Sequence, residues 1–217
     1  MINVLWLQSG GCGGCSMSLL CADGADFPGQ LAAAGVRLLW HPSLSMASGD
    51  EVLALLDDGR AGRVAVDVLC VEGAILRGPG GSGRFHLLAG SGRPMMDWVR
   101  ELAAVARHVV AVGSCAAWGG VSAAGANATE ACGLQYENAR PGGLLGTDFR
   151  ARGGLPVVNV AGCPTHPGWV IDTLAALAAD ALHADDLDPL ARPRFYADQL
   201  VHPGCPRNQY YEFKASA

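Results

Sequence analysis

Short apolar runs alternate with amphipathic stretches along most of the chain. The runs at 4–7, 36–40, 64–71, 109–112 and 155–160 are predicted strands, and the segments 16–21, 50–56, 94–108 and the stretch after Pro167 are predicted helices. The helical spacing is clearest in Met95, Trp98, Leu102 and Val105. Because strands that alternate with helices pair in parallel through right-handed crossovers, the pattern predicts an α/β doubly wound domain with a flavodoxin-like strand order.

The rest of the chain carries less periodicity. Residues 119–155 form a long glycine-rich excursion, and the glycine-rich segment 78–83 lacks the Gly-Lys-Ser/Thr ending of a phosphate-binding loop, so we expect a surface loop. Residues 185–193 resemble a linker, and 195–200 is strand-like. The predicted organisation is a flavodoxin-like domain at 1–184, then a linker and the incomplete start of a second domain at 185–217.

Composition narrows the functional classes. The 217 residues include 15 Lys and Arg and 20 Asp and Glu, for a net charge of −5, and Lys214 is the only lysine, so nucleic acid is not an expected partner. No apolar run approaches the ~18 residues of a membrane helix, and no signal segment precedes the first strand, so we expect a soluble cytoplasmic protein. Charged residues make up 16% against a typical ~25%, which predicts a permanent interface or a compact Ala- and Gly-rich domain.

Four of the eight cysteines follow predicted strands in glycine-rich turns. Cys12 and Cys15 follow the first strand, and Cys115 and Cys163 follow the last two. Because ligands of open α/β sheets bind beyond the carboxyl ends of the strands, these four thiols are expected to converge. The flanking glycines let the backbone approach a bulky inorganic group and point amides at it. In a reducing compartment, such cysteines indicate metal binding or catalysis before disulfides.

Four converging thiolates fit either a zinc ion or an iron–sulfur cluster. Structural zinc sites usually use two CxxC-like pairs, whereas this sequence has one CxxC and two single cysteines, with proline after Cys163, which favours a [4Fe–4S] cluster. Cys21, Cys70 and Cys132 lie in or beside apolar segments without a glycine turn. We therefore expect these three to be ordinary buried residues that contact no metal.

His202 and Cys205 form an isolated HxxC pair in the polar, aromatic tail. A surface histidine near a turn is the ordinary interpretation of such a pair. The alternative is half of a second iron–sulfur site with one imidazole ligand. Residues 206–217 contain no further cysteine, so we expect no stable second cluster in this chain by itself.

Four motifs together resemble the small, electron-transferring subunit of [NiFe] hydrogenases. They are the segments 6–15 (WLQSGGCGGC), 112–116 (VGSCA), 159–167 (NVAGCPTHP) and 202–207 (HPGCPR), and the similarity runs from the first strand to the last residue. The first motif and the absence of an export signal resemble the cytoplasmic group that contains the H2-sensing regulatory hydrogenases and related uptake enzymes.

The resemblance implies a division of roles between two subunits. Cys12, Cys15, Cys115 and Cys163 would hold the [4Fe–4S] cluster proximal to the nickel–iron centre, which lies in a separate large subunit. His202 and Cys205 would begin a distal cluster site, whose other cysteines, with those of a medial cluster, would lie beyond Ala217. The sequence departs from the family there, which implies either a truncated chain or a sequence that covers only the ordered part.

The resemblance also bears on oxygen tolerance and on partners. Some oxygen-tolerant membrane-bound relatives carry two extra cysteines near the proximal cluster, and the matching residues here are Gly14 and Gly120, which implies a conventional four-cysteine cluster. Glu72 is a candidate polar group near the subunit interface, although a buried, hydrogen-bonded glutamate without a role in proton transfer fits equally. An obligate heterodimer with the large subunit is implied; a dimer of heterodimers, a sensor kinase and other electron acceptors stay open.

Three functional hypotheses remain. In the first, H2 is cleaved in the large subunit and this chain passes the electrons outward, supplying no acid, base or nucleophile. The second is a zinc-stabilised binding module, and the third is a flavin-binding flavodoxin-like protein, which the fold alone permits. A metal analysis with an absorption spectrum discriminates among them.

Overall fold

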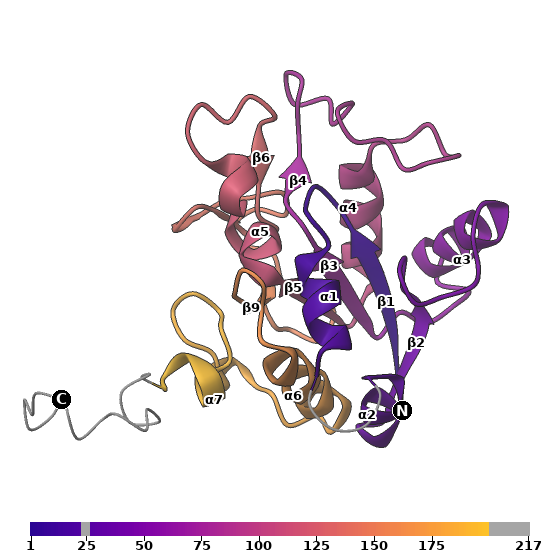
Figure 1. Cartoon of the computed structure of the whole chain (residues 1–217), viewed down its shortest axis with the longest axis vertical. Helices are drawn as coiled ribbons and strands as arrows, with labels where there is room; N and C mark the ends of the chain where they lie inside the picture. The colour runs from indigo at the N-terminus through magenta and orange to yellow at the C-terminus, as the bar shows by residue number, and fades with distance from the viewer. Residues whose placement is uncertain (23–26, 200–217) are drawn as a thin grey trace, which may run out of the picture.

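The computed structural model describes residues 1–22 and 27–199. A five-stranded parallel sheet lies at the centre of the molecule (Figure 1). The strands are β1 (Ile2–Gln8), β2 (Val36–Trp40), β3 (Val68–Glu72), β5 (His108–Val112) and β9 (Val158–Val160). They lie in the order β2-β1-β3-β5-β9, and every pairing is parallel. The strand order reverses beside β1, because β2 and β3 lie on opposite sides of it. The predicted doubly wound α/β fold with flavodoxin-like order is therefore confirmed.

Helices cover both faces of this sheet. One face packs against α1 (Gly14–Leu20), α2 (Phe27–Ala33) and α6 (Pro167–Ala178), and the other against α3 (Asp50–Arg60) and α4 (Met95–Val105). Each face therefore has its own hydrophobic core: the first core lies under α1, α2 and α6, and the second core lies under α3 and α4. Because successive side chains of a strand point to opposite faces, Val4 and Trp6 of β1 join the first core, whereas Leu5 and Leu7 join the second. Strands buried on both faces appear in the sequence as continuous apolar runs, which is why they were readily predicted.

The helix boundaries depend on local backbone geometry. Pro94 is the N-cap of α4, and the helix ends at Val105 because Ala106 is already extended. Helix α3 continues to Arg60, beyond the predicted residue 56. Helix α2 was not predicted, because Pro28 and Gly29 interrupt its sequence and its buried side chains are only Phe27 and Leu31.

The glycine-rich excursion at 119–155 contains only short elements: η1 (Gly120–Ala123), β6 (Ala131–Cys132), β7 (Tyr136–Glu137) and β8 (Arg140–Pro141). Strand β6 pairs antiparallel with β4 (Ile75–Leu76), and β7 pairs with β8. Glu130 of this excursion holds the glycine-rich segment 78–83, which was predicted to be a surface loop. Gly80 and Gly81 donate their backbone N–H groups to the Glu130 carboxylate at 2.6 and 2.9 Å.

Three predicted strands differ from the structure, and the one at 155–160 begins only at Val158. The strand predicted at 64–71 begins only at Val68, because the N–H of Val64 bonds to the carbonyl of Asp58 in the turn after α3. The segment predicted as strand-like at 195–200 begins instead as helix α7 (Arg194–Ala197), and Leu200 lies outside the described residues. An ion pair between Arg194 and Asp198 stabilises this helical turn.

The segment predicted as a linker packs on the first core. It contains η2 (Ala184–Asp186), and Leu187 and Ala191 are buried. Within residues 1–22 and 27–199, none of the helices has both the length and the apolar character needed to cross a bilayer.

Candidate functional site

The four cysteines at the predicted strand ends line one cavity of about 90 Å³ at the carboxyl edge of the sheet. Cys12 and Cys163 are exposed, whereas Cys15 and Cys115 are partly buried. The remaining lining residues are Gly11, Gly13, Gly14, Glu72, Gly73, Val112, Ser114, Gly162 and Pro164. Three loops that are far apart in the sequence thus bring four thiols to one place.

Cys21, Cys70 and Cys132 are not among the residues that line this cavity. Cys70 and Cys132 are buried in the cores, as expected for small apolar residues. Cys21 is exposed, so the prediction of a buried residue was wrong there; it follows the last residue of α1, where the helix meets solvent. His202 and Cys205 lie outside the described residues.

Tight turns place the sulfurs against the backbone. Helix α1 begins directly after Gly13, which has a φ of 72°, and the N–H of Gly14 lies 3.4 Å from the sulfur of Cys12. A backbone hydrogen bond from Thr165 lowers the pKa of Cys15, and one from Val121 lowers the pKa of Cys115. Such amide contacts favour a negatively charged sulfur.

Burial has the opposite effect on the pKa values of these two thiols. It raises the pKa of Cys15 to about 11 and also raises the pKa of Cys115. Neighbouring negative charges add to the shift, since Glu72, Cys115 and Cys12 repel a thiolate at Cys15. Ionisation of Cys15 and Cys115 is therefore favoured by a cationic centre beside them.

Two glycines are needed beside the sulfurs. A Cβ atom at Gly113 would lie 2.5 Å from the Cys15 sulfur, and one at Gly120 would lie 2.7 Å from the Cys115 sulfur. Both glycines also have positive φ angles, 84° and 55°. Gly14 adjoins the site as well, since its Cβ would lie 3.1 Å from the sulfur of Cys12. Of the two positions where the resemblance places extra cysteines in some relatives, Gly14 therefore lines the cavity and Gly120 adjoins the Cys115 sulfur.

Glu72 connects the end of β3 to the start of α1. Its Oε1 accepts the backbone N–H groups of Cys15 and Ser16, each at 3.1 Å. Its Oε2 accepts the Ser16 hydroxyl, the Trp6 indole N–H at 3.3 Å and the Gln8 amide at 3.2 Å. The carboxylate is 4% exposed, so these bonds replace its hydration. It fixes the backbone of the CxxC turn.

Ser16 and His41 extend this network and were not among the predicted site residues. Nε2 of His41 lies 3.2 Å from the Ser16 hydroxyl, and its Nδ1 accepts the N–H of Ser43 at 3.1 Å. Burial lowers the pKa of His41 to about 4, so the ring is neutral at neutral pH and its proton lies on Nε2. His41 directly follows β2, so the strand-end argument that found the cysteines applied to it too.

This cavity differs both from a site for a single metal ion and from a second cavity in the described residues. No group of three or more His, Cys, Asp or Glu side chains in residues 1–22 and 27–199 stands close enough to hold a single metal ion. A larger cavity of about 530 Å³ lies at the amino ends of the strands, with Arg60, Arg107 and Arg152 and without cysteine. The thiols thus gather at the opposite edge, around a space wider than one ion requires.

Comparisons with known proteins agree with this geometry. Residues 12–177 match the family described as NADH ubiquinone oxidoreductase, 20 Kd subunit. The chain is 34% identical to the F420 non-reducing hydrogenase I small subunit of Methanosarcina mazei, over 97% of this chain and 58% of that protein. It is 30% identical to the periplasmic [NiFeSe] hydrogenase small subunit of Desulfomicrobium baculatum, over 96% of this chain and 66% of that protein.

Solved structures give the same result. An actinobacterial-type NiFe-hydrogenase from Ralstonia eutropha H16 superposes with a TM-score of 0.80 at 31% identity, covering 97% of this chain and 63% of that one. The Ni-Fe-Se hydrogenase of Desulfomicrobium baculatum superposes with a TM-score of 0.76 at 30% identity, covering 99% of this chain and 77% of that one. The chain thus spans little more than half the length of the Methanosarcina relative. It belongs to the NADH ubiquinone oxidoreductase 20 Kd subunit family and, within it, to the small subunits of [NiFe] hydrogenases.

Proposed function

We propose that this chain is the electron-transfer subunit of a [NiFe] hydrogenase and that Cys12, Cys15, Cys115 and Cys163 hold its proximal [4Fe–4S] cluster. The single observation that carries the proposal is that four thiols from three separate loops line one cavity. When bound, such a cluster accepts and releases one electron at a time.

The residues around the cavity fit this cofactor. The donor set is four thiols, the ligands that iron–sulfur clusters use. A volume of about 90 Å³ compares with the ~10–15 Å³ that one water needs, so the space suits a polynuclear group better than one ion. Gly113 and Gly120 leave no room for a side chain behind two of the sulfurs. Because Glu72 and the neighbouring thiolates repel a negative charge on Cys15, a positively charged group is favoured among them.

The chain's own groups would set the reduction potential. Backbone N–H groups of Thr165 and Val121 stabilise negative charge on sulfur, and partial burial excludes water from Cys15 and Cys115. The Glu72 carboxylate, held by its five donors, adds a fixed negative charge at the same edge. Hydrogen bonds to sulfur, burial and net charge are the factors by which proteins tune such clusters.

A partner chain is part of the proposal. The exposed sulfurs of Cys12 and Cys163 are accompanied by apolar side chains on neighbouring elements, with Met17 66%, Leu20 55% and Val121 78% exposed. Apolar exposure beside a redox site supports coverage by another subunit. We propose that this partner is the large subunit with the nickel–iron centre, in an obligate heterodimer, with a dimer of heterodimers as a further level of assembly.

The biological role within the family is proposed from the sequence resemblance. We propose a cytoplasmic enzyme of H2 sensing or H2 uptake, with a sensor kinase or another electron acceptor downstream. The Desulfomicrobium baculatum relative is named periplasmic, so cell fractionation is the direct test of location. We also propose that His202 and Cys205 begin a second cluster site, and that a second domain starts within 185–217, after the part that packs on the first core.

The test is metal analysis of the chain, purified under anaerobic conditions with any partner it retains. We expect about four iron and four sulfide ions bound through the four cysteines, with broad visible absorbance. Replacing any one of Cys12, Cys15, Cys115 or Cys163 by alanine should remove most of this iron. Cys21→Ser is the matched control, because Cys21 is exposed and lies outside the cavity.

Each alternative predicts a different result. Zinc in place of iron would favour the zinc-stabilised module, and release of a yellow fluorescent cofactor would favour the flavin protein. Full iron content in one of the four alanine variants would refute the ligand assignment.

A further inference from the structure

A tyrosine from the C-terminal part of the described chain closes the edge of the sheet beside Cys163. The hydroxyl of Tyr196 donates to the carbonyl of Asn159 at 2.6 Å and accepts the N–H of Ala161 at 3.2 Å. Asn159 lies in β9, and Ala161 directly follows that strand, two residues before Cys163. One hydroxyl therefore fixes the backbone on both sides of Val160.

The position of β9 explains why this hydroxyl is needed. Strand β9 is the last in the sheet order, so among residues 1–22 and 27–199 its outer edge lacks a strand neighbour. Buried backbone N–H and C=O groups at such an edge require other partners. Asn159 receives one from the following segment, since its N–H donates to Ala191 at 2.8 Å and its side-chain amide to Leu190 at 2.8 Å. Tyr196 supplies the next two partners along the edge.

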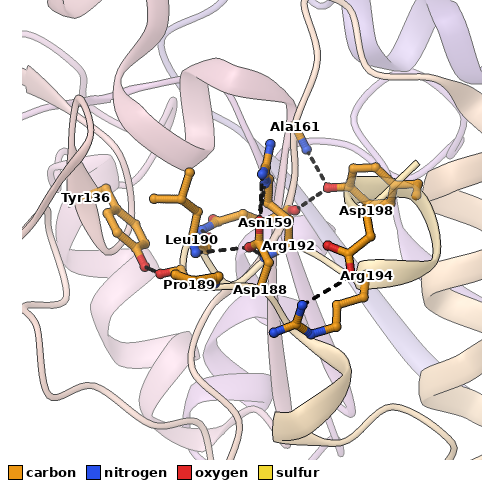
Figure 2. A network of polar contacts seen from close by, with 10 residues as sticks. Tyr136, Asn159, Ala161, Asp188, Pro189, Leu190, Arg192, Arg194 and Asp198 are labelled. Carbon is orange, nitrogen blue, oxygen red and sulfur yellow. Dashed lines mark hydrogen bonds and ion pairs between the residues drawn. The ribbon is translucent and has the colours of Figure 1, made fainter. Parts of the chain in front are cut away.

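Polar contacts within the segment that carries Tyr196 hold its backbone (Figure 2). The Asp188 carboxylate accepts the backbone N–H groups of Leu190 and Arg192 at 2.9 and 2.8 Å, and it pairs with the Arg192 guanidinium at 2.6 Å. The Tyr196 ring stacks on Trp169 of α6, with centroids 4.4 Å apart and planes 11° apart. The hydroxyl is therefore held in place from two directions.

The effect of the hydroxyl reaches two of the four cysteines. Gly162, between Ala161 and Cys163, donates its N–H to the Ser114 hydroxyl at 3.2 Å. Its carbonyl accepts the N–H of Ser114 at 2.8 Å, and Ser114 directly precedes Cys115. These two hydrogen bonds connect the Cys163 loop to the Cys115 loop, and Tyr196 holds the outer end of the connected pair.

We propose that Tyr196 is a positioning residue, which holds the Cys163 loop, and through Gly162 and Ser114 the Cys115 loop, in the geometry that binds the cluster. This rests on the proposed function, since it assumes that these cysteines are ligands. Segment 188–197, which the sequence assigned to a linker and a following domain, then completes the cluster site of the first domain.

The test uses Tyr196→Phe, which removes the hydroxyl and keeps the ring that stacks on Trp169. The matched control is Tyr136→Phe, because the Tyr136 hydroxyl donates to the carbonyl of Pro189 in the same segment and not to β9. In the full chain, we expect backbone amides in the peptide 158–166 to exchange hydrogen about tenfold faster in Tyr196→Phe than in wild type or the control.

Two measurements on the iron-loaded protein complete the test. Tyr196→Phe should release iron to a chelator about tenfold faster, as loss of an outer contact to a metal site does. Its electron paramagnetic resonance spectrum in the reduced state should shift, while the control should match wild type. Unchanged exchange at 158–166 would overturn the proposal, and so would faster exchange with unchanged iron release and spectrum, because the role would then be structural only.

The two proposals fail in different ways. The exchange measurement requires no metal, so it reports on the loop whatever the metal content. If the four alanine variants kept their iron, the ligand assignment would fall irrespective of Tyr196. If they lost it while Tyr196→Phe behaved as wild type, only the positioning role would be refuted.

Discussion

The carboxylate of Glu72 accepts the backbone N–H of Cys15 at 3.1 Å, although the two residues are 57 positions apart in the sequence. The same carboxylate accepts four further hydrogen bonds from Trp6, Gln8 and Ser16. The end of one strand thereby determines the backbone of the turn that follows another. The strength of that connection can be measured directly.

Replacing Glu72 by glutamine should destabilise the protein by about 1–3 kcal/mol, because the amide has one acceptor oxygen and places an NH2 group against buried donors. Urea unfolding followed by circular dichroism measures the change. The control is Glu137→Gln, since Glu137 is half-exposed and pairs with Arg77, and there we expect a loss below about 1 kcal/mol. Equal losses in the two variants would contradict the anchoring role of Glu72.

Replacing Gly113 by alanine should lower both stability and iron content. The new methyl group would lie 2.5 Å from the Cys15 sulfur, and the φ of 84° disfavours any L side chain. Gly125→Ala is the control, because Gly125 has a φ of 63° but no atom near its added Cβ. That variant should show only the backbone cost of about 1–2 kcal/mol and keep its iron. Iron retention in Gly113→Ala at the control's level would refute the steric argument.

Stability should depend on His41 below pH 6.5. Burial lowers the pKa of His41 to about 4, whereas the unfolded chain binds the proton near the ordinary value of 6.5. The contribution of neutral His41 is therefore fully present above pH 6.5 and is lost as the pH falls toward 4. Unfolding free energies between pH 4 and 8 should show a shallower acid loss in His41→Gln than in wild type.

Other titratable groups also affect the pH dependence of stability, and their contributions must be distinguished from that of His41. Glu72 faces the same cluster and, when ionised, favours a charged His41, which opposes the effect of burial. Burial also lowers the pKa values of His86 and His108, so they add to the acid loss in every variant. A wild-type slope in His41→Gln would argue against a buried neutral ring.

Replacing Glu130 by alanine should loosen the glycine-rich surface loop without unfolding the sheet. Its carboxylate accepts the N–H groups of Gly80 and Gly81, so its removal should speed hydrogen exchange in the peptide 78–83 by about tenfold. Global stability should change by less than about 1 kcal/mol, because the two N–H groups that Glu130 binds lie in the exposed part of the loop, at 79–81. Glu51→Ala, at an exposed residue of α3, serves as the control. Unchanged exchange in 78–83 would mean that other contacts hold the loop.

The sheet and the gathering of the four thiols followed from the sequence for a simple physical reason. Strands such as β3 and β5 are buried on both faces, so their sequences are uninterrupted apolar runs, and the carboxyl ends of parallel strands share one edge. A residue's position after a strand was therefore enough to place Cys115 and Cys163 near Cys12. The metal that these thiols bind stays a prediction.

Features that depend on distant contacts were missed. Tyr196 lies in a segment that appears strand-like because Phe195 and Tyr196 favour strands, yet stacking on Trp169 and the bonds to β9 select one helical turn. Helix α2 combines Pro28 and Gly29 with few apolar residues, and only packing by Phe27 and Leu31 reveals it. The bonds of Glu72 likewise depend on the register between β1 and β3, which sequence spacing does not determine.

The strand order has a consequence for the order of synthesis. The cysteines of the cavity belong to the first, fourth and fifth strands of the sheet in chain order, and the last of them, Cys163, lies beyond an edge strand. A ribosome that has completed β5 and its following turn has released only three of the four thiols. Those three lack the loop that Tyr196 later holds against β9. Under the proposed function, the complete ligand set therefore exists only once Cys163 has been synthesised, and the Tyr196 contact that holds its loop forms later still.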